Sequence, residues 1–272
     1  MMVGVAVSGN KARQITSSLP KANVLGIGIH AVTMRDAVDA VTAAIQGRQK
    51  GYVCVAGVHG VMEARRDPFL AAIFQGAFLV VPDGMPTVWM GKSQGLAMAR
   101  VFGPDLMLAV LQESELAQAT HYLYGGAPGV AKQLKEVLLQ KYPGLRIVGT
   151  HCPPFRPLSA REQSALIDEM NSLQPDIIWI GLSTPKQEKF MAEYLPRLAT
   201  TLMIGVGAAF DFHTGRINDS PAWVKQLGLQ WVHRLAQDPL RLWRRYLVNN
   251  PPFLCNAILQ TLGLREFKLD RH

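Results

Sequence analysis

Short apolar segments rich in β-branched residues alternate with amphipathic segments along most of this chain, and this pattern restricts the fold more than any other feature. Strands buried on both faces of a sheet are apolar throughout, and parallel strands are joined by helical crossovers. We therefore predict an α/β fold, with a parallel sheet and helices on both of its faces. The predicted strands are Asn23–Ile29, Tyr52–Val55, Phe78–Val81, His121–Tyr124, Arg146–Thr150, Ile177–Gly181 and Leu202–Val206.

The amphipathic segments between these strands predict helices. Thr33 precedes the first of them and Asp36 follows three residues later, a pairing typical of a helix start, and Ser159 is a second candidate cap. The predicted helices are Thr33–Gln46, Gly60–Arg66, Phe69–Gln75, Asp105–Glu115, Val130–Lys141, Ala160–Leu173 and Pro185–Tyr194.

The C-terminal part of the chain has a different pattern, because from Pro221 onwards it predicts helices only. Residues 210–272 contain nine Lys or Arg and five Asp or Glu, which is half of the formal net charge of +8. We therefore divide the 272 residues into a flexible extension (1–22), an α/β core (23–215) and a helical basic appendage (216–272).

The composition excludes several classes of protein. With 49% hydrophobic and 18% charged residues, the chain can bury a large core, which excludes wholesale disorder. The basic balance favours a nucleic acid, a phosphorylated metabolite or an anionic membrane surface as partner, but no aromatic-and-basic motif supports nucleic acid. No stretch reaches the roughly 18 apolar residues of a transmembrane helix. Three cysteines without a CxxC pair predict a reduced, cytoplasmic protein with neither disulfides nor a zinc site.

Ligands of parallel α/β sheets bind beyond the carboxyl ends of the strands, so the loops there are the candidate site. Asp83 follows an apolar strand and is flanked by Pro82 and Gly84. A carboxylate fixed on such a loop suits a general base, and it equally suits a turn in which Asp bonds its own backbone.

Three further loops carry glycines or polar residues that suit a phosphate or a sugar. Glycines before a helix let backbone N–H groups approach a phosphate, although tight turns need glycine too. Glu188 could also simply favour the helix dipole. The chain has no D-x-D motif, which argues against a bound metal and for Arg, Lys and helix N-termini meeting the charge of a diphosphate. These candidate residues are Gly125, Gly126, Gly129, Lys186, Gln187, Glu188, Gly205, Gly207 and Asp211.

The appendage contains one pronounced amphipathic helix. Asp238-Pro239 suits its N-cap and first position, and Pro251-Pro252 is predicted to break it. An apolar stripe of Leu240, Trp243 and Leu247 runs beside basic residues, so the helix either packs with a solvated basic face or holds a diphosphate at a membrane. The apolar segment after the prolines suits a membrane interface or the contact of a homo-oligomer.

Taken together, the segments VVPDGMPTVWMGK (80–92), YGGAPGVA (124–131), PDIIWIGLSTPKQEKFM (175–191), GVGAAFDFHTG (205–215) and GLQWVHRLAQDPLRLWRRYL (228–247) resemble the bacterial WecG/TagA/CpsF glycosyltransferase family. The resemblance implies a Rossmann-like core that needs neither metal nor cofactor and binds the inner face of the cytoplasmic membrane peripherally. It also implies an inverting transfer from a UDP-sugar donor to a polyprenyl-diphosphate-linked glycan acceptor.

The resemblance assigns roles to individual residues. It makes Asp83 the catalytic base and places Gln187 in the donor site. We also expect Gly84, next to the base, to bind the donor. The resemblance implies that the appendage arginines, Arg234, Arg241, Arg244 and Arg245, meet the diphosphates and the membrane.

The sequence departs from the family pattern at several positions. Residues 55–60 lack the usual Thr-x-Asn pair, and His59 stands nearby, either replacing it in acceptor binding or packed internally. Gln230 replaces a usual Glu. Residues 58–64 and 153–158 resemble the exopolysaccharide branch, which adds glucuronate to N-acetylmannosamine and N-acetylmannosaminuronate as donor sugars. The missing pair also leaves open a non-catalytic, nucleotide-sugar-binding partner of a glycan assembly complex.

Overall fold

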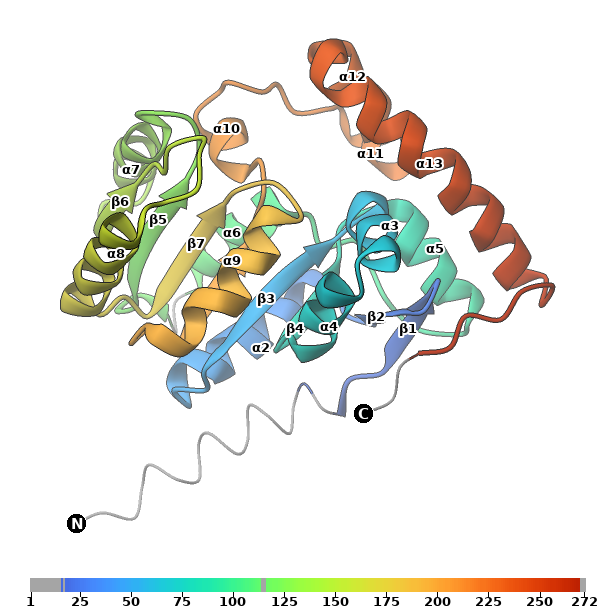
Figure 1. Cartoon of the computed structure of the whole chain (residues 1–272), viewed down its shortest axis with the longest axis horizontal. Coiled ribbons are helices and arrows are strands. Elements are labelled where there is room, and N and C mark those ends of the chain that lie inside the picture. The colour runs from blue at the N-terminus through green and yellow to red at the C-terminus, as the bar shows by residue number, and fades with distance from the viewer. Residues whose placement is uncertain (1–15, 17, 114–115, 270–272) are drawn as a thin grey trace.

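The computed structural model describes Thr16 and residues 18–113 and 116–269, and its centre is a six-stranded parallel sheet (Figure 1). The strand order is β4-β3-β8-β7-β5-β6, and every neighbouring pair is parallel. The strands are β3 (Gly51–Ala56), β4 (Leu79–Pro82), β5 (Thr120–Gly125), β6 (Arg146–His151), β7 (Ile177–Gly181) and β8 (Leu202–Gly205). The predicted α/β class is confirmed.

Two apolar layers cover the sheet, because successive side chains along each strand alternate between its faces. Val53, Leu123 and Ile204 join one buried cluster, while Tyr124 and Met203 join the other. The first cluster includes residues of α2 (Met34–Gln46), α6 (Gly103–Gln112), α7 (Val130–Lys141) and α10 (Ala209–His213). The second includes residues of α3 (Val58–Arg66), α4 (Pro68–Gly76), α8 (Ala160–Leu173) and α9 (Lys186–Tyr194), which ends in the short turn η2 (Leu195–Arg197).

The single strand predicted over Asn23–Ile29 is wrong. The segment forms a hairpin of β1 (Lys21–Val24) and β2 (Ile27–His30), which pair antiparallel outside the main sheet. Leu25 and Gly26 turn the chain with positive φ angles of 54° and 92°. The Gly26 N–H is held by the Asn23 side chain at 2.8 Å. Leu25 is an unusual residue for such a turn. The segment therefore reads as one continuous apolar strand, and its sequence does not indicate the turn.

The predicted break at Pro251-Pro252 is also wrong, because α13 (Pro239–Thr261) continues through both prolines. Pro252 has no N–H to donate to the Val248 carbonyl one turn back. Arg66 of α3 donates to that oxygen instead, at 3.4 Å. A contact with the core therefore replaces a bond within the helix.

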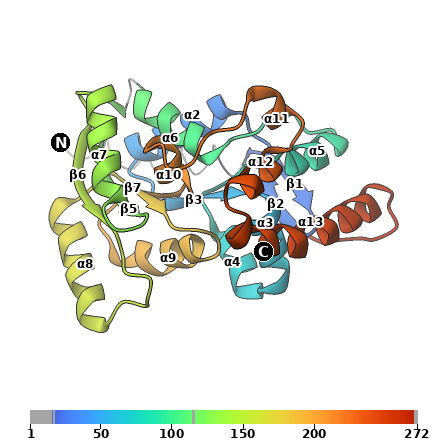
Figure 2. The same cartoon turned by 90° about the horizontal axis from the view of Figure 1, so that it is seen from above.

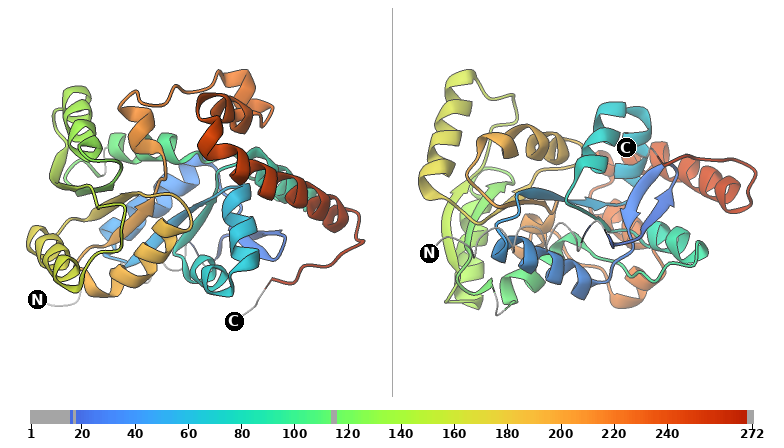
Figure 3. Two further views of the ribbon diagram at one scale, coloured as in Figure 1. Left: turned by 45° about the horizontal axis from the view of Figure 1, so that its top comes forward. Right: turned by 90° about the horizontal axis from the view of Figure 1, so that it is seen from below.

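The appendage lies against the core (Figures 1 and 2). It contains α11 (Ala222–Gln226), α12 (Gln230–Gln237) and α13. The far end of α13 lies beside the β1–β2 hairpin (Figure 3), where Gln260 bonds the backbone of Asn23 and Leu25 at 2.8 and 3.0 Å. The extension predicted for residues 1–22 falls largely outside the described residues, although Lys21 and Ala22 belong to β1. Within the described part of the chain, no helix combines the length and apolarity needed to cross a membrane.

Candidate active site

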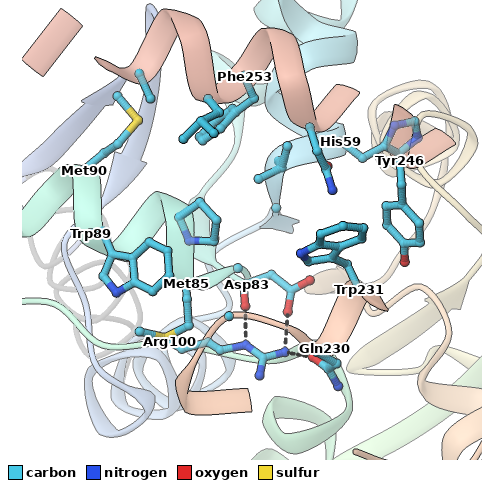
Figure 4. Close-up of a pocket in the computed structure, with 18 of the residues that line it drawn as sticks. His59, Asp83, Met85, Trp89, Met90, Arg100, Gln230, Trp231, Tyr246 and Phe253 are labelled. Atoms are coloured by element: carbon cyan, nitrogen blue, oxygen red, sulfur yellow. Dashed lines mark hydrogen bonds and ion pairs between the residues drawn. The ribbon is translucent and has the colours of Figure 1, made fainter. Parts of the chain in front are cut away.

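A cavity of about 730 Å³ lies between the appendage and the core. Its walls come from the loops after β3 and β4, from α5 (Met85–Ser93), and from α12 and α13. Asp83, Arg100 and Gln230 lie together on one side of the close-up, while Met90 and Phe253 lie on the other (Figure 4). The cavity therefore has a charged end and an apolar end.

Asp83 stands at the charged end, directly after β4. Its backbone N–H donates to the Ala56 carbonyl at 3.1 Å, which fixes it beside the end of β3. Arg100 donates through Nε to the Asp83 carbonyl oxygen, and its Nη2 lies 3.8 Å from Asp83 Oδ1 (Figure 4). Among the described residues, the buried Oδ1 has no hydrogen-bond partner, so this oxygen can take a proton or accept a hydrogen bond from a hydroxyl.

Two opposing effects act on the Asp83 carboxyl. Burial raises its pKa above the usual 3.8, because an apolar surrounding disfavours the charged form. The positive charges of Arg100, Arg234 and Arg245 act in the opposite direction. The result is a carboxylate that holds a proton more readily than a surface Asp and sits among three guanidinium groups, a suitable setting for a general base.

Of the four arginines that the resemblance assigns to the diphosphates and the membrane, Arg234 of α12 and Arg245 of α13 line the cavity. Arg245 reaches Ser183 Oγ at 3.4 Å, and its buried Nε has no hydrogen-bond partner in the part of the chain that the structure describes. Such free donors can take the negative charge of a diphosphate.

His59 also lines the cavity, but both of its ring nitrogens are engaged. Nε2 lies 3.3 Å from the Thr184 carbonyl and Nδ1 lies 3.1 Å from Asn249 Nδ2. Burial, and next the charge of Arg245, lower the His59 pKa to about 4, so the ring is neutral near pH 7. Since a carbonyl only accepts and an amide nitrogen only donates, Nε2 carries the hydrogen. This geometry favours the internally packed reading of His59 over direct acceptor binding.

The glycines of the sheet-edge loops lie outside this cavity. Gly125, Gly126 and Gly129 have φ angles of 135°, 76° and 84°, which few other residues adopt. A Cβ on Gly125 would lie 2.5 Å from the Gly181 carbonyl oxygen, so packing against β7 requires glycine there. Their phosphate-binding role stays a prediction, because the strand-to-helix turn alone accounts for them.

Gln187 and Glu188 are almost wholly buried at the start of α9. The Gln187 side chain accepts from the Gly207 N–H at 3.0 Å and donates to Glu188 Oε1 at 2.9 Å. Thr184 Oγ1 donates to the same oxygen at 2.9 Å, while Glu188 Oε2 has no hydrogen-bond partner among the residues with described positions. Burial raises the Glu188 pKa. These bonds tie the loop after β8 to α9, so a donor must compete with them to reach Gln187.

Of the remaining candidates, one lines the cavity and six do not, and one of those six, Gly205, is buried at the end of β8. Gly84 lines the cavity beside Asp83. Those that do not line it are Lys186, Gly205, Gly207, Asp211, Arg241 and Arg244. Arg241 pairs with Asp238, and Arg244 is exposed. Asp238 holds the predicted N-cap position of α13 without a capping bond from its side chain.

Sequence reasoning missed Arg100 and the aromatic walls, which are Trp89, Trp231 and Tyr246. Arg100 lies in the loop between α5 and α6, outside the motifs singled out above, and its guanidinium reaches Asp83 and Gln230 only in the folded chain. Trp89 is 49% and Trp231 38% exposed, so part of each ring is accessible to a ligand in the cavity.

Among the residues that the structure describes, no three His, Cys, Asp or Glu side chains are grouped to hold a metal ion.

Comparison with known proteins identifies similar chains. The family model described as "Glycosyl transferase WecG/TagA/CpsF family" matches residues 22–267. An N-acetylglucosaminyldiphosphoundecaprenol N-acetyl-beta-D-mannosaminyltransferase from Bacillus spizizenii is 27% identical over 186 residues, which is 68% of this chain and 70% of the relative. The protein of the same name from Bacillus subtilis (strain 168) is 26% identical over 176 residues, 64% of this chain and 66% of the relative.

Proposed function

This chain belongs to the WecG/TagA/CpsF family of glycosyl transferases, and from that premise we propose that it moves a sugar from a UDP-sugar to a polyprenyl-diphosphate-linked glycan. Both relatives are named for transfer to an undecaprenol-diphosphate-linked sugar. The donor sugar is of the N-acetylmannosamine, N-acetylmannosaminuronate or glucuronate type.

The observation that carries the proposal is the two-ended cavity. Its charged end offers Asp83 with Arg100, Arg234 and Arg245, which suits a hydroxyl nucleophile and a diphosphate. Its apolar lining suits the first isoprene units of the acceptor, and consists of Met85, Pro86, Met90, Leu242, Phe253, Leu254, Ala257, Ile258 and Leu262.

The proposed reaction is a single displacement with inversion. Asp83 takes the proton of an acceptor hydroxyl, whose oxygen forms a bond to the anomeric carbon of the donor. The bond from that carbon to the UDP oxygen breaks, and UDP leaves with the bonding electrons. The arginines of the appendage stabilise the charge of the leaving diphosphate in place of a metal ion.

The test measures UDP release from a panel of UDP-sugars with a short-chain polyprenyl-diphosphate glycan as acceptor. We expect acceptor-dependent release that persists in EDTA and falls about 10²–10⁴-fold in Asp83→Asn, the usual contribution of a positioned base. The variant should still bind UDP. Near wild-type turnover of Asp83→Asn would remove Asp83 from the role of base. UDP binding without turnover on any donor would support a non-catalytic partner instead.

We also propose that α12 and α13 rest on an anionic bilayer surface. Leu240 is 90%, Leu247 63% and Trp243 50% exposed on α13, beside Arg241 and Arg244. An exposed apolar stripe next to arginines is the pattern of an interfacial helix. We expect the protein to co-sediment with vesicles containing anionic lipid, less so in high salt and less so in Leu240→Ser/Trp243→Ser. Salt-independent self-association without vesicle binding would make the stripe an oligomer contact.

A further inference from the structure

Asn249 is a buried polar residue on α13, 2% exposed, whose whole side chain is used in bonds. Its Oδ1 accepts from Arg66 Nη2 at 2.8 Å. Its Nδ2 donates to His59 Nδ1 at 3.1 Å and to the Arg245 carbonyl at 2.7 Å. Arg66 and His59 both belong to α3 of the core, so one amide joins the appendage to the core at two points.

The prolines of α13 add a third point. Arg66 Nη2 reaches the Val248 carbonyl that Pro252 leaves without its helical donor. The same guanidinium therefore bonds both the side chain of Asn249 and the backbone beside it. The Val248 carbonyl, which lacks its donor within the helix, is thus bonded by α3. This bond can form only when α13 takes one position along α3.

The contacts continue from Asn249 into the site. His59 bonds the Thr184 carbonyl, and Thr184 Oγ1 bonds the buried Glu188. Arg245 lies one helical turn before Asn249 and, through its charge, acts on both Asp83 and Glu188. Within residues 18–113 and 116–269, Asp83, Glu188 and Arg245 each have a buried polar atom without a hydrogen-bond partner. A ligand that bonds these atoms would meet groups whose spacing depends on where α13 docks.

We propose that Asn249 is a positioning residue, which sets the place of α13 against α3 through Arg66 and His59 and thereby holds Arg245 beside Asp83. This inference rests on the proposed function for the part that Arg245 plays in transfer. The other buried α13 side chains, Leu242, Phe253 and Ala257, are apolar. Apolar contacts are non-directional and tolerate sliding, whereas a satisfied buried amide tolerates one arrangement.

The first test is kinetic and uses Asn249→Ala with Asn256→Ala as its control. Asn256 lies on the same helix, but its side chain bonds Pro252 and Arg265 of the C-terminal region and no described residue of the core. We expect Asn249→Ala to lower kcat at least tenfold and Asn256→Ala less than twofold. Arg66→Ala, whose side chain is 42% exposed, provides a second variant that should fold and lower kcat in the same way.

A background variant separates positioning from a general loss of structure. If Asn249 acts through Arg245, then adding Asn249→Ala to Arg245→Ala should lower kcat less than twofold further. An equal fold-loss in the wild-type and Arg245→Ala backgrounds would overturn the proposal, as would unchanged turnover in Asn249→Ala and Arg66→Ala.

The second test does not need turnover. Amide hydrogen exchange over residues 240–250 should quicken in Asn249→Ala and Arg66→Ala, and stay as in the wild type in Asn256→Ala. Unchanged exchange in the first two variants would overturn the proposal. A wild-type protein without transferase activity would contradict the proposed function alone, and the exchange result would then decide whether Asn249 positions α13.

Discussion

Asp83 and Gln230 contact the same side chain, the guanidinium of Arg100, and this shared neighbour sets the charge around the candidate base. Arg100 opposes the rise in the Asp83 pKa that burial causes. A neutral amide at Gln230 leaves the guanidinium charge uncompensated on that side, so residue 230 controls how strongly Arg100 acts on Asp83.

The variant Gln230→Glu should therefore move the acid limb of kcat/KM to higher pH. Asp83 accepts a proton only when ionised, so activity falls as the pH drops through its pKa, and an added carboxylate raises that pKa further. The measurement is the pH profile of UDP release in the two proteins. Gln237→Glu, an exposed position of the same helix, should leave the profile in place. If the acid limb of Gln230→Glu stays fixed or moves to lower pH, the assignment of this limb to Asp83 is contradicted.

The loop between β5 and α7 contains two glycines with positive φ angles, Gly125 and Gly129, whose surroundings differ. Gly125 ends β5 with a φ of 135°, and its hydrogen faces the Gly181 carbonyl that ends β7. Gly129, at the start of α7, also has a positive φ of 84°, but nothing lies within 4 Å of where its Cβ would be. Both glycines therefore have a backbone conformation that would strain any residue with a Cβ, but only Gly125 is tightly packed.

This difference predicts unequal costs for the same substitution. Gly129→Ala should lower the free energy of unfolding by about 1–2 kcal/mol, the usual cost of a left-handed alanine. Gly125→Ala should cost at least about 2 kcal/mol more, because the Cβ also meets backbone that cannot move without disturbing the β5–β7 pairing. Urea denaturation of both variants measures the two costs. Equal losses of unfolding free energy would show that the contact of the Cβ with Gly181 adds no cost.

Across the whole molecule, buried histidines link folding to pH. His30 and His121 are each 1% exposed, and burial, as the largest cause, lowers both pKa values to about 4. The unfolded chain binds these protons near pH 6.5, whereas the folded chain does not until about pH 4. The stability they contribute is therefore complete above pH 6.5 and is lost as the pH falls toward 4.

We expect the free energy of unfolding to fall by about 1–2 kcal/mol per buried histidine between pH 7 and pH 5. Asp83 and Glu188 oppose this fall, because a raised pKa makes the folded state bind the proton more tightly. Urea denaturation between pH 7.5 and pH 5 measures how steeply the free energy of unfolding depends on pH. This dependence should be less steep in His121→Asn, which removes one titrating group. A wild-type stability independent of pH would contradict the prediction.

The sequence by itself determined the elements and the order in which they occur. Hydrophobic periodicity and capping pairs such as Thr33 with Asp36 depend on neighbouring residues, so the six sheet strands and most helices could be predicted, along with the loop that holds Asp83. Tertiary structure decided the turn at Leu25-Gly26 and the continuation of α13 through Pro252, where Arg66 supplies the missing donor. It also decided the cavity, because Asp83, Arg100 and Arg245 meet only when α12 and α13 dock on the core, and no local pattern records contacts between segments so far apart.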